Sequence, residues 1–311
     1  MLFWGLIVAY VSGIVSYALN RSKVLAWIGI GTALVASILG GSRIEISPYE
    51  STPYSFGLDW FVISFVFSML IFIPIEKAFA LHKDQKILRK GWRIDMMYFI
   101  VSHLLIQFIL LWTNFFAAGV FGWAATEGLQ SAIRSMPIWM QFIIAVFLAD
   151  LFQYWTHRVH HKVGFLWKFH SIHHSSESMD WLAGSRTHLG EIFMTRAFVM
   201  VPLYVCGFSE PALNAYVVLV GVQAVAIHAN LGLNFGWLRY VLVTPQFHHW
   251  HHAKDSEYCD ANYAVHLPLV DMMFGTYRCP KGQWPDEYGI VSGEPPPSFW
   301  AQMWHPYRKS K

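Results

Sequence analysis

The sequence predicts an all-α integral membrane protein, a multi-span helical bundle of about five full spans plus a helical hairpin, with a cytoplasmic histidine-rich cap. Of the 311 residues, 55% are hydrophobic and only 13% are charged, whereas an average soluble domain carries roughly 25% charged residues. Long uncharged runs recur along the chain, and the 16 histidines gather mainly in polar stretches outside them. These three observations argue against an ordinary soluble protein.

Seven uncharged or nearly uncharged runs mark the candidate helices, since a bilayer needs roughly 20 apolar residues. They are Met1 to Asn20, Val24 to Ser42, Trp60 to Ile75, Met96 to Thr126, Ser135 to about Thr156, Ile192 to Ser209 and Pro211 to Leu238. Arg21 and Lys23 follow the first run, the reverse of the order in a cleavable signal peptide, so we interpret it as a retained anchor. Gly207 and Pro211 bracket a short turn between the last two runs, which predicts a helical hairpin.

The basic residues predict the orientation, because short loops rich in Lys and Arg stay in the cytoplasm. Residues 77–93 are rich in both, whereas the loops at residues 43–59 and 127–134 are poor in them. Alternation then places residues 157–190, and everything after about residue 240, in the cytoplasm. We expect the histidine cap and the C-terminus on that side of a bacterial inner membrane or the endoplasmic reticulum.

Composition also limits the domain count and the partners. No repeat or flexible linker appears, so we expect one membrane domain over residues 1–311, with residues 1–42 as an extra N-terminal helix pair. The net charge of +3 is too small to indicate nucleic acid. Cys206, Cys259 and Cys279 form no CxxC pair, so a disulfide framework is not expected.

Histidines cluster in three short motifs, HRVHH, HSIHH and HHWHH. They contain His157, His160 and His161, then His170, His173 and His174, and finally His248, His249, His251 and His252. Residues three and four apart share a helix face. Each motif can therefore point two imidazoles one way and a third aside, which lets one motif serve two neighbouring metals. In HSIHH and HHWHH we expect the first and fourth positions to bind one metal and the fifth the other, whereas His157 and His161 of HRVHH lie one turn apart on one face.

Imidazole suits iron, zinc and copper, and eight or nine such ligands exceed the three or four of one zinc site. The sequence therefore predicts a di-metal cap. It contains no HExxH protease motif, no Glu-x-x-His of a carboxylate-bridged di-iron bundle, and no GxGxxG or Walker pattern.

Taken together, these motifs resemble the fatty acid hydroxylase superfamily of membrane di-iron oxygenases, which includes sterol desaturases and alkylglycerol monooxygenase. The resemblance covers roughly residues 96–280. Its features are Asp150-x-x-x-Tyr154-Trp155-x-His157-Arg158-x-x-His161, the HSIHH motif, a lone His228 followed by Asn230, Thr244-Pro245-x-x-His248-x-x-His251-His252, Asp255-x-Glu257-Tyr258 and Asp271-x-x-Phe274-Gly275-Thr276.

The resemblance implies two ligand sets. One metal would be held by His157, His170, His173, His248 and His251, and the other by His161, His174, His228 and His252. Some family hydroxylases have a second histidine four residues after the position of His228, whereas this chain has Gly232. Around the ligands we expect supporting roles for Asp150, Tyr154, Asn230, His160 and His249, since metal-bound imidazoles usually donate their other N–H to a carboxylate or carbonyl.

By the same resemblance, the protein would use two iron ions and O₂ to hydroxylate an unactivated C–H bond of a lipid or sterol-like substrate that enters from the bilayer. Zinc can replace iron during isolation. Electrons would come from a separate donor such as a reductase, a ferredoxin or a cytochrome b5-like carrier. Lys83, Lys86, Arg89 and Lys90 would suit an acidic carrier, although positive-inside anchoring is the simpler explanation of these residues.

Three alternatives stay open at this point. A desaturase of the same family would share the first hydrogen abstraction. A bis-histidine haem cytochrome would need facing ligands within the spans, and a metal transporter would need ionisable residues near the midplane.

Overall fold

The structure is a computed structural model that describes residues 2–19, 23–41, 58–255, 257–291, 293 and 295–308. The predicted turn at Arg21 and most of the predicted loop at residues 43–59 lie outside these residues. The chain forms two compact units, Met1–Thr52 and Pro53–Lys311, and each is described by itself.

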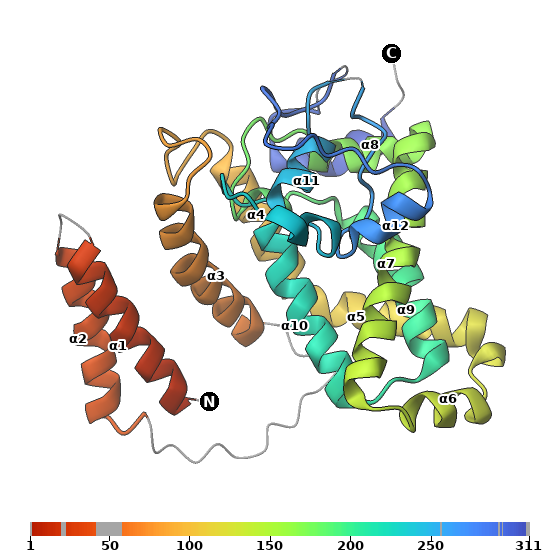
Figure 1. Ribbon diagram of the computed structural model, residues 1–311, viewed down its shortest axis with the longest axis horizontal. Helices are drawn as coiled ribbons and strands as arrows, with labels where there is room; N and C mark the ends of the chain where they lie inside the picture. Colours follow the sequence, from red (N-terminus) through yellow and green to blue (C-terminus); the bar gives the residue numbers. More distant parts are fainter. Residues whose placement is uncertain are drawn as a thin grey trace. The chain divides into compact units, whose positions relative to one another are not determined.

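The first unit contains two helices, α1 (Leu2–Leu19) and α2 (Val24–Ile38), which pack side by side (Figure 1). The Tyr10 hydroxyl and Ser37 Oγ lie 3.2 Å apart across the pair. A Cβ at Gly13 would stand 2.6 Å from Ile30 Cγ1, so the missing side chain permits this close approach. Both N-terminal runs are therefore helical, although α2 has only 15 residues.

The second unit is also helical, and its described residues contain no strand, only an isolated bridge between Ala253 and Tyr288. Its α-helices are α3 (Leu58–Ala78), α4 (Trp92–Leu104), α5 (Ile106–Phe121), α6 (Glu127–Arg134), α7 (Ile138–Lys162), α8 (Gly164–His174), α9 (Leu189–Cys206), α10 (Glu210–Ala226), α11 (Pro245–His251), α12 (Pro268–Met273) and α13 (Phe299–Trp304). Short 3₁₀ turns occur at Gly122–Ala124, Ala183–Ser185, Gly236–Tyr240 and His305–Tyr307. The all-α prediction is confirmed for this part of the chain.

Three described helices are long and apolar enough to cross a membrane, namely Phe61–Ala78 of α3, all of α7 and all of α9. The predicted span at residues 96–126 is instead broken into α4 and α5, which are bent by 57° and supply a fourth span if the pair counts as one. Ser102 Oγ donates to the Tyr98 carbonyl at 2.7 Å, and such bonds to the preceding turn bend helices. The seventh run also changes, because α10 ends at Ala226 and has only 17 residues.

Local signals explain the hairpin between α9 and α10. The His188 side chain caps the start of α9 by accepting a bond from the Gly190 N–H. Gly207 ends α9 in the left-handed conformation with φ of 59°, which glycine adopts without strain. Pro211 lies in the first turn of α10, where its missing N–H costs no helical bond. The turn predicted from Gly207 and Pro211 is therefore present.

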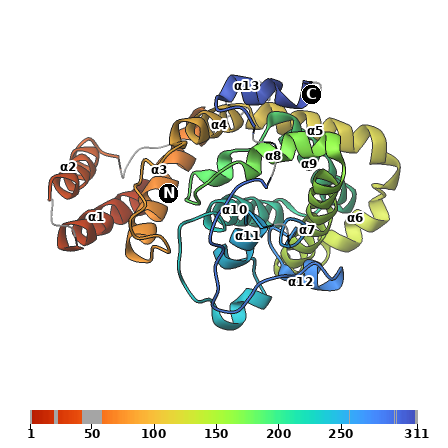
Figure 2. The ribbon, with the colours of Figure 1, turned by 90° about the horizontal axis from the view of Figure 1, so that it is seen from above.

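The histidine-bearing helices lie together at one end of the bundle. Figure 1 shows α8 and α11 beside the end of α7, and Figure 2 shows the same grouping from above. Helix α6 lies at the opposite end of α7 (Figure 1). A buried core that includes Tyr154, Phe247 and Tyr263 joins α7 to α11 and to the loop before α12. This packing sets the last two turns of α7 against α8 and α11.

Asp150 connects α7 to the loop before α12. Its side chain is fully buried, and its carboxylate accepts bonds from the N–H groups of Val265, His266 and Leu267 at 2.9, 3.1 and 2.7 Å. One side chain therefore satisfies three main-chain N–H groups. Its loss would be costly, because a buried donor without a partner costs about 1–3 kcal/mol.

Asp150→Ala should therefore lower the free energy of unfolding of the metal-free protein by about 3 kcal/mol or more, since three buried donors lose their acceptor. Asp150→Asn keeps one acceptor oxygen and should lose less. Thermal unfolding of the purified protein measures both changes. Equal unfolding midpoints for Asp150→Ala and the unsubstituted protein would contradict this contact.

Candidate metal centre

The nine histidines predicted as ligands converge into two groups, each able to hold a metal ion. In each group one ligand atom per residue lies within 4.8 Å of all the others. The first group comprises His157, His161, His170, His174 and His251, and the second comprises His173, His228, His248 and His252. His161 is half-buried and the other eight are buried.

The division differs from the ligand sets that the resemblance implied, in which His173 and His248 lay with His157. In α8 the first and fifth positions of HSIHH, His170 and His174, share the first group, and the fourth, His173, joins the second. In HHWHH the first and fifth positions, His248 and His252, share the second group, and the fourth, His251, joins the first. The reason is helix geometry, because residues four apart differ by about 40° around the axis and residues three apart by about 60° in the other direction.

In the first group, three of the five rings donate their Nδ1 proton to an acceptor outside the group. His157 Nδ1 donates to the Tyr263 carbonyl at 2.7 Å, and His251 Nδ1 donates to the Ala261 carbonyl at 2.8 Å. His170 Nδ1 donates to the Glu191 carboxylate at 2.6 Å. These bonds place the proton on Nδ1 and leave Nε2 of each ring with a free lone pair.

Two rings of the second group are oriented in the same way. His173 Nδ1 donates to the Arg186 carbonyl at 3.1 Å, and His228 Nδ1 donates to the Ala224 carbonyl at 2.8 Å. His248 Nδ1 and His252 Nδ1 have no partner among the described residues. Their Nε2 atoms lie 3.1 Å apart, and His248 Nε2 lies 2.9 Å from His228 Nε2.

Unprotonated nitrogens therefore face one another. His157 Nε2 and His170 Nε2 lie 2.9 Å apart, and His173 Nε2 and His228 Nε2 lie 3.3 Å apart. Neither member of either pair has a proton to share, so the two lone pairs repel unless a cation lies between them. Metal–nitrogen bonds of about 2.0–2.1 Å place neighbouring ligand nitrogens about 3 Å apart. The residues thus fit a bound metal.

Burial keeps the rings neutral, as metal binding requires. It lowers the pKa of His173 and of His228 to about 3, with neighbouring imidazoles as a further cause for His173. Burial first, and adjacent imidazoles second, also hold the pKa of His170, His174 and His248 well below the ordinary value of 6.5.

The two groups adjoin each other inside an aromatic enclosure. The His174 ring of the first group stacks on the His252 ring of the second, with centroids 4.4 Å apart. Tyr263 packs against His161 at 5.1 Å and Trp167 against His174 at 5.5 Å. Two metal ions bound here would be neighbours.

Comparisons with known proteins agree with this geometry, since residues 142–276 match the fatty acid hydroxylase family. This segment is a fatty acid hydroxylase domain. It contains all nine histidines of the two groups, and the resemblance drawn from the motifs is confirmed.

Among similar proteins, ornithine lipid hydroxylase OlsE of Rhizobium tropici is 28% identical over 176 residues, which cover 56% of this chain and 52% of OlsE. The alkylglycerol monooxygenase of Xenopus tropicalis is 33% identical over 131 residues, which cover 41% of this chain and 28% of that protein. The alkylglycerol monooxygenase of Homo sapiens is 33% identical over 130 residues, which cover 42% of this chain and 28% of that protein. The chain thus spans about half the length of one relative and less of the others. No solved structure matches.

The residues predicted to support the ligands lie elsewhere in the hydroxylase domain. Asp150 binds main-chain N–H groups and no described histidine ring. His160 Nδ1 bonds to the Thr156 carbonyl at 2.8 Å, and His249 Nδ1 to the Tyr288 hydroxyl at 2.9 Å. Asn230 binds the main chain of His82 at 2.9 and 3.1 Å. Asp150, His160 and Asn230 thus bind main-chain groups and His249 binds a tyrosine hydroxyl, so these bonds do not reach the imidazoles of the two groups.

Tyr154 acts through a longer chain of contacts. Its hydroxyl lies 2.9 Å from Thr276 Oγ1, which donates to Asp271 at 2.7 Å. Asp271 accepts a bond from the Tyr263 N–H at 2.8 Å, and the Tyr263 carbonyl accepts the proton of His157 Nδ1. Tyr154 is thus connected to His157 through three residues.

Among the described residues, the carboxylate that bonds to a histidine of the two groups is Glu191, which the sequence did not predict. It lies in the first turn of α9 and is buried, and its Oε2 atom has no partner among the described residues. The sequence signal that could have indicated Glu191 is an acidic residue at the start of an apolar run, three positions after His188. The carbonyls of Arg186, Ala261 and Tyr263 could not be inferred from side-chain types.

Gly232, where some family members have another histidine, lies against the chain after α3. Its N–H donates to the Phe79 carbonyl at 2.8 Å, and a Cβ there would stand 3.1 Å from Leu81 Cα. A histidine therefore has no room at this position unless the backbone moves, and the second group has four imidazoles.

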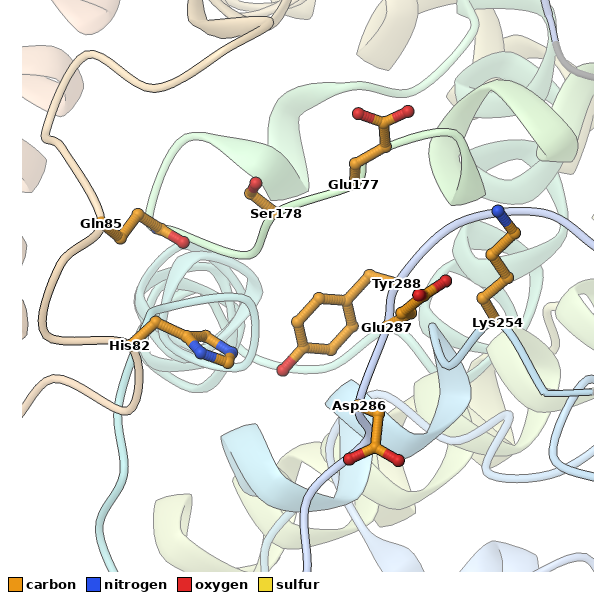
Figure 3. A pocket seen from close by; sticks show the side chains of 8 residues that line it. All are labelled: His82, Gln85, Glu177, Ser178, Lys254, Asp286, Glu287 and Tyr288. Atoms are coloured by element: carbon orange, nitrogen blue, oxygen red, sulfur yellow. The ribbon is translucent and has the colours of Figure 1, made fainter.

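A polar cavity of about 400 Å³ lies among loop residues that follow α3, α8 and α11 (Figure 3). Its lining residues are His82, Gln85, Glu177, Ser178, Lys254, Asp286, Glu287 and Tyr288. The Lys254 N–H donates to the Glu287 carbonyl at 2.9 Å, and the Gly289 N–H to the His252 carbonyl at 3.2 Å. The cavity wall is therefore joined directly to the segment that carries His252.

The basic patch predicted after α3 is smaller than expected. Lys83, Lys86 and Lys90 are exposed, but Arg89 is only 5% exposed and pairs with Asp95 and Asp180. Burial of Arg89 leaves three lysines on this surface.

Glu191→Ala should weaken metal binding by the first group about 10–100-fold, the usual effect of removing a partner of a ligand histidine. Glu191→Gln keeps an acceptor and should weaken it less. Competition between the protein and a chelator for Co²⁺ measures the affinity. Glu177→Gln, at an exposed carboxylate paired with Lys90, is the control. An unchanged affinity in Glu191→Ala would contradict the role of this carboxylate.

The lowered histidine pKa values predict a steep acid dependence in the metal-free protein. The rings stay neutral in the folded state but take up protons near pH 6.5 when the chain unfolds. The free energy of unfolding should therefore fall as the pH drops below about 6.5, by about 1.4 kcal/mol per pH unit for each such histidine. Thermal unfolding at a series of pH values measures this fall. A midpoint that stays constant down to about pH 5 would contradict it.

Proposed function

We propose that this protein is a membrane-bound di-iron oxygenase that uses O₂ to hydroxylate an unactivated C–H bond of a lipid or sterol-like substrate. The observation that carries the proposal is the pair of histidine groups whose unprotonated nitrogens face one another at 2.9–3.3 Å. Nine neutral ligands in two adjoining groups suit two ions better than one.

We assign the nine histidines as metal ligands and iron as the functional metal. Imidazole ligands accept iron, zinc and copper alike, and the hydroxylase domain favours iron because reductive O₂ chemistry needs a redox-active metal. Zinc has no redox chemistry and would give an inactive protein.

The relatives and the position of the site support the proposed substrate class. OlsE is named for an ornithine lipid and alkylglycerol monooxygenase for an alkylglycerol, and both substrates carry acyl or alkyl chains. His157 and His161 lie in the last two turns of α7, a candidate span. A hydrocarbon chain that leaves the bilayer beside α7 would therefore reach the ligands directly.

The two irons, when bound, supply the reduction of O₂ and the oxidation of the C–H bond. The chain itself supplies neutral imidazoles held in one tautomer by the carbonyls of Tyr263, Arg186 and Ala224. Rings such as Tyr263 and Trp167 keep water from the ligands, which protects a reactive site from side reactions.

Hydroxylation converts one C–H bond, O₂, two electrons and two protons into C–OH and water, so a reductant is required. The sequence contains no nucleotide-binding fingerprint and no cysteine cluster for an iron–sulfur centre. A separate electron donor, such as a reductase, a ferredoxin or a cytochrome b5-like carrier, would supply the electrons. We place its docking site on the cytoplasmic face together with the histidine cap.

Desaturation of the same bond is the alternative within the family. It would remove a second hydrogen instead of adding oxygen. The hydroxylase and monooxygenase names of the relatives favour hydroxylation.

The test is turnover by the purified full chain, loaded anaerobically with Fe²⁺ and placed in vesicles that contain an ornithine lipid or an alkylglycerol. With NADPH, ferredoxin and ferredoxin reductase, labelled oxygen from ¹⁸O₂ should enter the lipid, and the chain should hold about two irons. His173→Ala and His251→Ala should each abolish activity and lower the metal content, because each removes a ligand from one group. Mass spectrometry and metal analysis provide the two measurements.

His305→Ala is the matched control, since His305 lies in the C-terminal 3₁₀ turn outside both groups. One iron or fewer in active protein would refute the two-metal proposal. A lipid that gains a double bond and no label would establish the desaturase alternative.

A further inference from the structure

Four charged side chains form a buried ionic cluster between the start of α4 and the loop after α8. Arg89, Asp95, Asp180 and Arg186 are 5%, 0%, 3% and 6% exposed. Arg89 binds both oxygens of Asp180 at 2.8 Å and Asp95 at 2.7 Å, and Arg186 Nε donates to the other oxygen of Asp95. Two positive and two negative charges balance, so the cluster leaves no buried charge without a partner.

This cluster is directly connected to the second histidine group through Arg186. The main-chain carbonyl of Arg186 accepts the proton of His173 Nδ1 at 3.1 Å. Its guanidinium also donates to the carbonyl and hydroxyl oxygens of Ser175 at 3.3 and 3.2 Å. Ser175 directly follows His174, the last residue of α8. Arg186 therefore holds the end of α8 with its side chain and orients His173 with its backbone.

Gly91 provides the space that the cluster needs. It precedes α4 with φ of 87°, and a Cβ at this position would stand 2.8 Å from Arg186 Nη2. The conformation and the close contact both require glycine.

Arg89, Gly91 and Asp95 lie outside the hydroxylase domain, which matches only residues 142–276. Asp180 and Arg186 lie inside it. Half of the cluster is thus contributed by a segment that the family match does not include.

We propose that Arg89, Asp95 and Arg186 are positioning residues for the second metal site, so that the hydroxylase domain depends on residues 89–95 to form its ligand set. The proposal rests on the assignment of His173, His228, His248 and His252 as metal ligands. None of the three contacts a metal ligand through its own charged atoms, and each acts through the Arg186 carbonyl.

The geometry explains why arginine is needed. A guanidinium is planar and presents its donors in a fixed fork, whereas a lysine ammonium is a single point charge. Arg186 uses different nitrogens for Asp95 and Ser175, and lysine at this position cannot keep both contacts. The loop would then shift, and the carbonyl that fixes the His173 ring would shift with it.

The test uses the full chain freed of metal and titrated with Co²⁺ against a chelator. The unsubstituted protein should bind two ions, and absence of this binding would refute the proposed metal sites themselves. Arg186→Lys and Arg89→Lys should each weaken one of the two ions about 10–100-fold and leave the other unchanged. Glu191→Gln should weaken the other ion, the one held by the first group. Glu177→Gln, at an exposed ion pair, should weaken neither.

The absorption spectrum of bound Co²⁺ shows which ion is affected, because the first group offers five imidazoles and the second four. A single buried substitution can prevent folding, so the double variant Arg89→Gln, Asp180→Asn is included. It removes one charge of each sign, keeps the side-chain volume at residue 180 and shortens the side chain at residue 89 by two heavy atoms. It should fold, as judged by thermal unfolding, and should still bind the second ion about 10-fold more weakly. Unchanged affinity for both ions in the folded variants, or an equal loss for both, would overturn the proposal.

Discussion

Repulsion between imidazole lone pairs is the constraint on which the rest of the cap depends. His157 and His170 each commit their only ring proton to an acceptor outside the group, so their Nε2 atoms face each other at 2.9 Å with nothing to donate. A single buried polar group without a partner costs about 1–3 kcal/mol, and the same arrangement recurs between His173 and His228, whose Nε2 atoms lie 3.3 Å apart. The surrounding structure must therefore hold the rings together until a cation offsets the repulsion.

Main-chain carbonyls provide most of the contacts that hold the imidazole rings in place. Carbonyls of Tyr263, Ala261, Arg186 and Ala224 each take one imidazole proton, and each carbonyl lies in a segment fixed by other buried groups. Asp271 accepts a bond from the Tyr263 N–H, and Asp95 of the buried ionic cluster pairs with Arg186. The pattern resembles the outer partners that metal sites generally need for ring orientation, except that backbone atoms replace most of the carboxylates.

The sequence predicted the helical class and all nine histidines of the two groups, because both depend on residue type and on short-range spacing. It did not predict which histidine belongs to which group. This division depends on small differences in direction around the axis of α8 among His170, His173 and His174. Glu191 was missed because its partner His170 lies 21 positions away. The break between α4 and α5 was missed for a similar reason, because the run at residues 96–126 contains no proline, and Ser102 acts through a local bond that composition does not reveal.

The division of the α8 and α11 histidines between the two groups limits which mutations the gene for this protein can tolerate. Both helices contribute to both groups, so neither motif can be assigned to one ion alone. One residue added between His170 and His173 would turn everything after it by about 100° around the axis of α8. That single event would misdirect His174 in one group and His173 in the other. Point substitutions can therefore accumulate around the motifs during evolution, whereas insertions and deletions inside them remove both halves of the centre at once.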